Sequence, residues 1–213
     1  MSLWSLIQSG GWSLILLLLC SLVAWAVILE RVWSYRRLTQ DLRAFHLEAM
    51  NTLLTSNLDS VRGLCRRHER LPTAVVLSSA LERLSARDER LRARWREAAE
   101  RRRQLVNQDL RRNLWILGSI GSAAPFIGLF GTVIGILRSF GEMAKTGAGG
   151  FAVVAGGISE SLIATAAGII VAVISVMAYN IFQTRSGSLV LMIRLQVEEF
   201  VELISGSAGE NGA

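Results

Sequence analysis

Charged side chains are absent from long parts of this sequence. Residues 1–29 contain none, whereas residues 30–112 hold 19 of the 23 Lys and Arg residues and 11 of the 17 Asp and Glu residues. This segregation argues against a water-soluble globule, which interleaves polar and apolar residues within each element. A lipid bilayer explains it, because a charged residue at mid-depth costs about 2.5–3.5 kcal/mol on insertion scales.

The residue clusters of a metal or phosphate-transfer enzyme are also missing. His46 and His68 are 22 residues apart, with no Cys or acidic residue at metal-ligand spacing. No glycine-rich loop is followed by Lys, as phosphate binding would require. Cys20 and Cys65 lie in an apolar and a charged segment, so we expect no disulfide between them. We predict no catalytic residues, no metal and no cofactor.

Three apolar runs are long enough to cross a bilayer, which needs about 20 residues. They cover residues 12–29, 114–137 and 161–182. The predicted fold is an all-α integral membrane protein with three transmembrane helices and long cytoplasmic helical extensions, assembled as an oligomer. The predicted segments are a periplasmic N-terminus (1–11), transmembrane helix 1 (12–33), a cytoplasmic helical domain (34–113), transmembrane helix 2 (114–138), a short periplasmic loop (139–150), transmembrane helix 3 (151–183) and a cytoplasmic C-terminal helix and tail (184–213).

The basic residues predict the orientation. Cytoplasmic segments next to membrane helices are enriched in Lys and Arg, and the segment after the first apolar run is the Arg-rich one. The N-terminus is therefore expected in the periplasm and the C-terminus in the cytoplasm of a bacterial inner membrane. Ala24, Trp25 and Ala26 resemble a signal-peptide cleavage site, but no Lys or Arg precedes the run, which favours an uncleaved helix.

The charged segment has helical spacing. Leu38, Leu42, Phe45 and Ala49 recur at threes and fours from Ser34 to about Leu71, and a second amphipathic stretch follows Pro72, over 73–84. No Gly or Pro occurs between Pro72 and Gly118, so one helix is expected from Arg87 to Leu137. Charge spacing is expected to support it locally, within the run from Arg87 to Arg90 and between Glu97 and Arg101. A C-terminal amphipathic helix is expected over 189–204, with Leu191, Leu195, Val197 and Val201 apolar.

The second and third runs are rich in small residues. Small faces let helices pack closely in lipid, and Pro125 is expected to kink the second helix. Thr132 and Thr165 lie at comparable depths and can face each other, either as packing residues or as the lining of a polar path. Glu160 is the one acidic residue near the interior of a crossing, either functional or solvated at the outer boundary. The glycines assigned to helix packing are Gly128, Gly131, Gly135, Gly157 and Gly168.

Two segments carry a family resemblance. Residues 125–136 read PFIGLFGTVIGI, and residues 153–166 read VVAGGISESLIATA, followed by AYN at 178–180. This pattern resembles the signature of the MotA/TolQ/ExbB proton-channel family, and three crossings suit its ExbB/TolQ branch. The sequence departs from the family at Gly156 and Ile174, where proline is usual, so we expect a straighter third helix.

The resemblance implies a homopentamer around two copies of an ExbD- or TolR-like single-span partner that supplies a transmembrane Asp. Thr132 and Thr165 would face this Asp, and Glu160 would be the family's helix-three glutamate. The complex would use proton-motive force to drive a TonB- or TolA-like protein at the outer membrane. TonB-dependent transport, Tol-type envelope maintenance and gliding motility all remain open. A non-conducting membrane scaffold is the second interpretation, and a membrane enzyme is the weakest.

Overall fold

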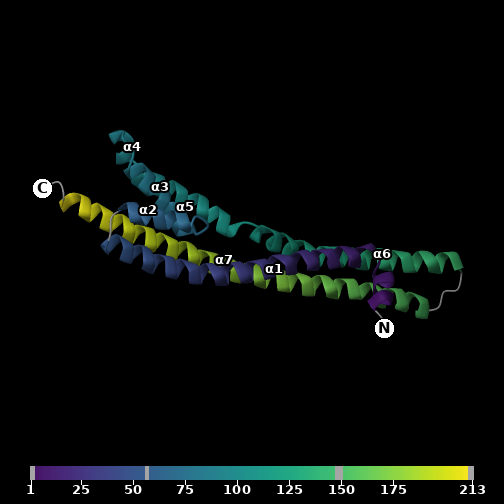
Figure 1. Ribbon diagram of the computed structural model, residues 1–213. Coiled ribbons are helices and arrows are strands. Elements are labelled where there is room, and N and C mark those ends of the chain that lie inside the picture. The colour runs from purple at the N-terminus through teal and green to yellow at the C-terminus, as the bar shows by residue number, and fades with distance from the viewer. Residues whose placement is uncertain (1–2, 56–57, 147–150, 211–213) are drawn as a thin grey trace. The chain divides into compact units, whose positions relative to one another are not determined.

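In the part of the chain that it describes, residues 3–55, 58–146 and 151–210, the computed structural model is helical and contains no strand. Two very long helices, α1 and α7, lie near the two ends of the chain (Figure 1). The helices are α1 (Leu3–Thr55), α2 (Leu58–Arg67), α3 (Pro72–Leu84), α4 (Glu89–Ala93), α5 (Trp95–Arg111), α6 (Leu114–Thr146) and α7 (Phe151–Glu210).

The chain divides into two compact units. The first, here called the apolar unit, contains residues 1–31 and 113–182. The second, here called the charged unit, contains residues 32–112 and 183–213. Helices α1 and α7 each contribute to both units because each continues past the boundary of its apolar run.

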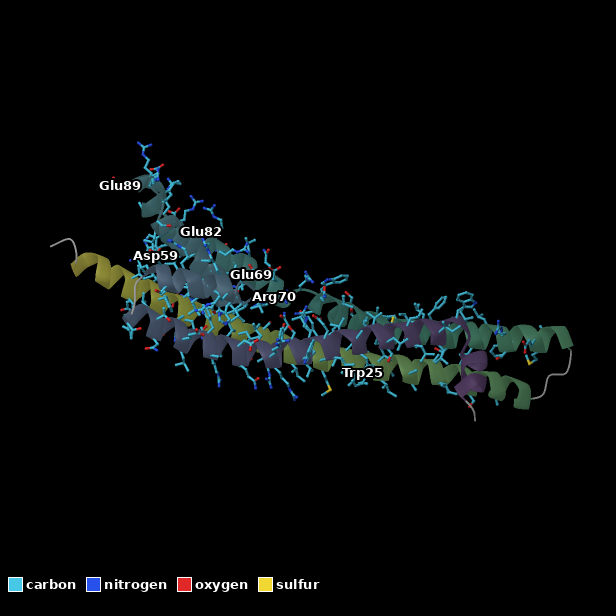
Figure 2. The ribbon with its side chains drawn as sticks, viewed as in Figure 1. Trp25, Asp59, Glu69, Arg70, Glu82 and Glu89 are labelled. Carbon is cyan, nitrogen blue, oxygen red and sulfur yellow. The ribbon has the colours of Figure 1, made fainter. Side chains whose placement is uncertain are left out.

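Among the residues that the structure describes, three helical stretches are long and apolar enough to cross a membrane: Trp12–Thr55, Trp95–Ala144 and Ala155–Ile204. This agrees with the prediction of an all-α protein with three transmembrane helices. Many large apolar side chains on these stretches are exposed, which water would not favour but lipid would. Trp25, labelled in Figure 2, is one of them and is 49% exposed.

The charged unit has its own apolar core. Phe45 and Ala49 of α1 lie in it, as the spacing of the first charged segment predicted, together with residues from α2, α3 and α7. Its buried members are Phe45, Ala49, Val61, Leu64, Cys65, Leu71, Ala74, Leu77, Leu81, Phe200 and Ile204. Helix α3 begins at Pro72, and Leu71 before it is extended (φ −83°, ψ 129°), as a residue before proline usually is. The second amphipathic stretch, predicted over 73–84, is thereby confirmed.

The single helix predicted from Arg87 to Leu137 is wrong. The structure divides this range among α4, α5 and α6. Asn113, between α5 and α6, has φ 66°, a left-handed conformation that Asn adopts more readily than most residues because its short side chain can hydrogen-bond locally. The amide of Arg112 donates to the Asp109 carbonyl at 3.2 Å, which closes the end of α5. Helix α5 therefore ends without the Gly or Pro that the prediction required.

Three other local predictions need correction. The helical stretch predicted over 34–71 is divided between α1, which ends at Thr55, and α2, which begins at Leu58. The segment 139–150, predicted as a loop, is helical up to Thr146, and residues 147–150 lie outside the described residues. The apolar face predicted over 189–204 is partly wrong, because Leu191 and Leu195 are 54% and 56% exposed. The buried residues of this stretch are Leu189, Ile193, Gln196, Val197, Phe200 and Ile204.

The predicted charge pairs also differ. In the part of the chain that the structure describes, neither Glu97 with Arg101 nor the run 87–90 forms a salt bridge between side chains. Instead, Glu100 pairs with Arg103 at 2.6 Å, and the Asp88 carboxylate accepts a hydrogen bond from the backbone amide of Arg90 at 2.9 Å. Spacing on a helix permits several partners, and side-chain geometry selects among them.

Candidate functional site: the contact between helices α6 and α7

Glycines bring the backbones of α6 and α7 into close contact within the apolar unit. A Cβ atom placed on Gly128 would lie 2.8 Å from the carbonyl oxygen of Ala164 and 2.9 Å from the Cα of Thr165. One placed on Gly168 would lie 2.6 Å from the carbonyl oxygen of Ala124. A larger residue at either position would require the helices to shift. Close packing of this kind is what associates helices in lipid, where apolar contact alone gains little.

The same contact continues toward the C-terminal end of α6. A Cβ on Gly135 would lie 2.5 Å from the Cβ of Ser161, and Gly157 faces Ser139. Each step forward along α7 is matched by a step back along α6, so the two helices are antiparallel neighbours. Ser139 was not singled out from the sequence, although it lies four residues after Gly135 and continues the same helix face.

A third helix joins this contact. Gly131 of α6 lies against Ser13 of α1 as well as against Ala164 of α7. The sequence pattern gave no signal for Ser13, since one small polar residue in a leucine-rich run does not reveal which helix it will meet. The apolar unit is therefore packed through small residues from all three long helices.

Thr132 and Thr165 meet in the middle of this contact. Their Oγ1 atoms are 3.2 Å apart, and Thr132 is only 7% exposed. The Thr132 hydroxyl also lies 2.6 Å from the carbonyl oxygen of Leu129, and the Thr165 hydroxyl lies 3.0 Å from that of Gly128. The structure thus brings together the two threonines that were predicted to lie at comparable depths.

The chemistry of the pair follows from its proton count. Each hydroxyl has one proton to donate and two lone pairs that accept. When both protons point at backbone carbonyls, both Oγ1 atoms are available to accept a hydrogen bond from a third group. When either proton rotates away, that hydroxyl becomes a donor. The pair can therefore bind a carboxyl group in its protonated form and in its ionised form.

The other candidate site residues singled out from the sequence lie within α6 and α7. Pro125 lies inside α6 and is half-buried. Glu160 falls within the bounds of α7, and its side chain lies outside the described residues. Gly156 and Ile174, where proline is usual in the family, both lie inside α7, which continues through them from Phe151 to Glu210.

Large apolar side chains cover the outer faces of α6 and α7. Phe126 and Phe130 of α6 are 71% and 64% exposed, and Ile170 and Met177 of α7 are 60% and 59% exposed. These faces suit lipid or further apolar helices.

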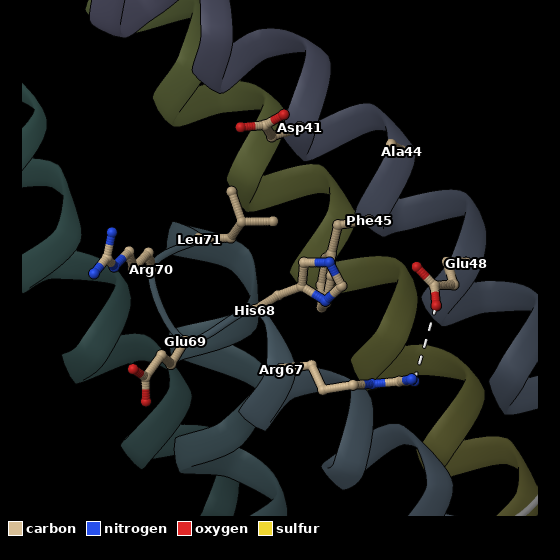
Figure 3. Close-up of a pocket in the computed structure, with 9 residues that line it drawn as sticks. All are labelled: Asp41, Ala44, Phe45, Glu48, Arg67, His68, Glu69, Arg70 and Leu71. Atoms are coloured by element: carbon tan, nitrogen blue, oxygen red, sulfur yellow. Dashed lines mark ion pairs between the residues drawn. The ribbon is translucent and has the colours of Figure 1, made fainter.

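The two histidines contact different partners. The Nε2 of His46 lies 3.2 Å from a carboxylate oxygen of Glu199. His68 packs edge-on against Phe45, with ring centroids 5.5 Å apart, beside a hollow of the charged unit (Figure 3). Among the described residues, no group of three or more His, Cys, Asp or Glu side chains could hold a metal ion. Arg67 and Glu48 pair across this hollow at 3.9 Å, so its charges are partly neutralised.

Comparison with known proteins gives the family. Residues 68–194 match the MotA/TolQ/ExbB proton channel family. The biopolymer transport protein ExbB of Salmonella typhimurium is 34% identical over 178 residues, which cover 81% of this chain and 72% of that protein. The protein of the same name from Neisseria meningitidis serogroup A is 34% identical over 172 residues, 78% of each chain. The Tol-Pal system protein TolQ of Pseudomonas aeruginosa is 41% identical over 97 residues, 46% of this chain and 42% of that protein.

The family match covers α3 to α6 and most of α7, including the glycine contact and both threonines. It thus agrees with the resemblance seen in residues 125–136, 153–166 and 178–180, and extends it into the charged unit. The chain therefore belongs to the MotA/TolQ/ExbB proton channel family, as a multi-pass membrane protein of the ExbB/TolQ branch.

Proposed function

We propose that this ExbB/TolQ-like subunit of a proton-driven motor carries its proton path past the Thr132–Thr165 pair. The 3.2 Å contact between the two hydroxyls carries the proposal. Charged residues are absent from 114–137, and also from 161–182. A proton that crosses the bilayer centre needs a titratable group there, because an isolated charge in lipid is costly. That group has to come from another chain.

The second chain that fits is an ExbD- or TolR-like single-span protein with an Asp in its membrane helix. A protonated Asp can donate its O–H to a threonine oxygen, while both threonine protons stay on the carbonyls of Leu129 and Gly128. Once ionised, the Asp can accept a hydrogen bond from a threonine whose proton has rotated. An unpaired buried carboxylate costs far more than a hydrogen-bonded one, so the pair lowers the barrier for charge to appear at this depth.

The proposal extends to the assembly. Several copies of this chain, five by family resemblance, surround the partner helix, and the exposed apolar faces of α6 and α7 supply contacts between copies and with lipid. The protein lies in the bacterial inner membrane, with its N-terminus in the periplasm and its charged unit in the cytoplasm. The motor couples proton-motive force to work at the outer membrane through a TonB- or TolA-like protein. Glu160 belongs to the same path in this proposal.

Substitution of the threonines tests the proton path. Thr132→Ala and Thr165→Ala should each abolish proton-driven transport in cells while the complex still assembles, because alanine removes the hydroxyl. Alanine also removes the γ-methyl group, a loss that the serine variants share. Thr132→Ser and Thr165→Ser serve as matched controls that keep the hydroxyl, and should keep activity. Assembly is measured by co-purification of the single-span partner. Activity is measured as proton-driven transport in cells and as proton flux in proteoliposomes.

A passive scaffold makes the opposite prediction. If both alanine variants drive transport at the wild-type rate, the threonines are packing residues and the proposal fails.

A further inference from the structure

A hollow on the charged unit, lined by α3, α4 and α5, has no role in the proton path. It is here called the arginine hollow, and its volume is about 390 Å³, within the usual range for small-ligand sites. Glu82 of α3, labelled in Figure 2, is one of the residues that line it. The charged residues that line it are Glu82 and Arg83 on α3, Arg94 just before α5, and Glu97, Arg101 and Arg102 on α5.

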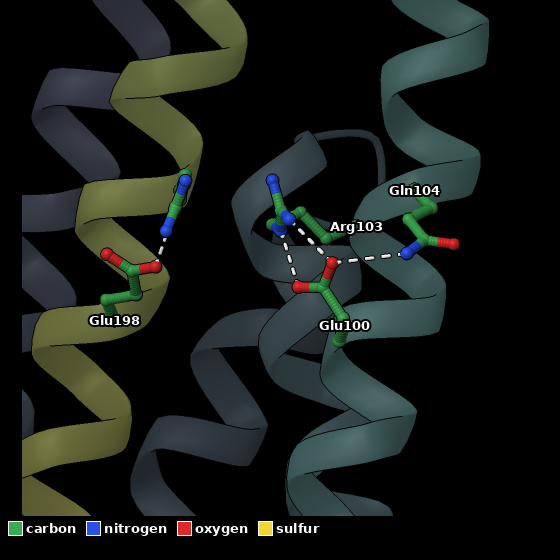
Figure 4. A network of polar contacts seen from close by, with 5 residues as sticks. Glu100, Arg103, Gln104 and Glu198 are labelled. Atoms are coloured by element: carbon green, nitrogen blue, oxygen red, sulfur yellow. Dashed lines mark hydrogen bonds and ion pairs between the residues drawn. The ribbon is translucent and has the colours of Figure 1, made fainter.

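The arginines of the hollow have no polar partner among the described residues. Within the described part of the charged unit, the side chains of Arg83, Arg94, Arg101 and Arg102 make no ion pair or hydrogen bond. The adjacent Arg103 is different, because its Nε and Nη2 donate to the two carboxylate oxygens of Glu100 at 2.8 and 2.6 Å (Figure 4). These hydrogen bonds are the main cause that lowers the pKa of Glu100. Helix α5 thus pairs Arg103 and leaves the adjacent Arg101 and Arg102 available.

Local electrostatics favour an anion. Four guanidinium groups and two carboxylates leave a net positive charge in the hollow at neutral pH. Arg94 immediately precedes the first residue of α5, and its side chain makes no capping hydrogen bond. A cation is unfavourable at the positive N-terminal end of a helix, so the helix itself gains nothing from Arg94 there. Arg83, in contrast, lies in the last turn of α3, where a cation is favourable without any ligand.

We propose that the arginine hollow binds an anion with several phosphate groups. Planar guanidinium groups match phosphate oxygens and form charge-assisted hydrogen bonds with them. Glu82 and Glu97 oppose weakly charged anions, so several phosphate charges are needed to gain from all four arginines. The ligand is either a soluble polyphosphate or a lipid headgroup with clustered phosphates, and its binding does not depend on the threonine pair.

The test uses the full chain in nanodiscs of phosphatidylcholine and inorganic tripolyphosphate as the probe. Isothermal titration calorimetry near physiological salt should show saturable binding. The double variant Arg101→Gln/Arg102→Gln should weaken it roughly tenfold or more, as expected for the loss of charge-assisted hydrogen bonds. Arg43→Gln, an exposed arginine of α1 outside the hollow, is the matched control and should bind as the wild type does. Unchanged melting temperatures establish that the variants are folded.

Two results overturn the proposal: no binding to the wild type, or equal binding by the double variant and the wild type. A second arm identifies the source of the phosphates. Nanodiscs that contain cardiolipin should weaken tripolyphosphate binding if the natural ligand is a headgroup, since lipid then occupies the hollow. Unchanged affinity in these nanodiscs supports a soluble ligand.

Discussion

The close approach of α6 and α7 can be tested at Gly168, with Gly156 as a matched glycine on the same helix. A Cβ on Gly168 would lie 2.6 Å from the carbonyl oxygen of Ala124, whereas nothing lies within 4 Å of a Cβ on Gly156. Gly168→Ala therefore requires the helices to separate, and Gly156→Ala does not. The two variants otherwise make the same chemical change in the same helix.

The expected magnitude follows from this geometry. Ordinary contact begins at 3.4 Å, so the Ala124 carbonyl must move by about 0.8 Å, enough to lose a quarter to a half of the local van der Waals attraction. Overpacking of this kind costs about 1–3 kcal/mol. Each variant also gains up to about 1 kcal/mol in helix propensity. This gain cancels in the comparison, so Gly168→Ala should be less stable than Gly156→Ala by about 1–3 kcal/mol.

The free energy of unfolding can be measured by titration with SDS in mixed micelles, followed by tryptophan fluorescence. Gly168→Ala should unfold at a lower SDS fraction than the wild type, and Gly156→Ala at an equal or higher one. Proton flux should fall in Gly168→Ala as well, because the shift also separates Thr165 from Gly128. Equal stability of the two variants would refute the close backbone contact.

Three further predictions concern other parts of the chain. Burial raises the pKa of the Cys65 thiol to about 11. In a Cys20→Ser background, Cys65 should therefore resist maleimide at pH 8 until the protein is unfolded. The free energy of unfolding should fall between pH 9 and 11, because in this range only the thiol of the unfolded chain ionises. Asn113→Ala should lower the melting temperature, because the left-handed conformation costs alanine about 1–2 kcal/mol in free energy of unfolding. Asn113→Gly should not lower it. Gln196→Leu should cost about 1–3 kcal/mol in unfolding free energy, because the buried Thr73 hydroxyl, now 2.9 Å from the Gln196 amide oxygen, loses its acceptor.

Each of these three predictions has an outcome that would contradict it. A Cys65 that reacts as fast in the folded protein as in urea contradicts the burial argument. Equal melting temperatures for the Ala and Gly variants of Asn113 would show that its backbone conformation carries no cost. The double variant Thr73→Val/Gln196→Leu should recover most of the lost stability. If the double variant instead loses as much free energy of unfolding as the two single variants together, the hydrogen bond does not contribute to stability.

Local sequence determined the features that depend on composition and on short spacing. The three apolar runs, the start of α3 at Pro72 and the buried face through Phe45 and Ala49 all follow from residues near one another in the chain. Hydropathy and proline geometry act locally, so they can be recognised without knowledge of the partner. The small-residue faces of α6 and α7 belong here too, since the spacing of Gly128 and Gly135 is visible in the sequence.

Tertiary structure decided the features that depend on contacts between distant segments of the chain. The break at Asn113 carries no Gly or Pro signal. Which stripe of the C-terminal helix is buried, Ile193 rather than Leu195, depends on the elements that cover it. The sequence placed Thr132 and Thr165 at similar depths, but only packing of one helix on the other brings their hydroxyls to 3.2 Å. Contact between residues 33 positions apart depends on helix rotation and register, and these are fixed by the whole interface rather than by either segment.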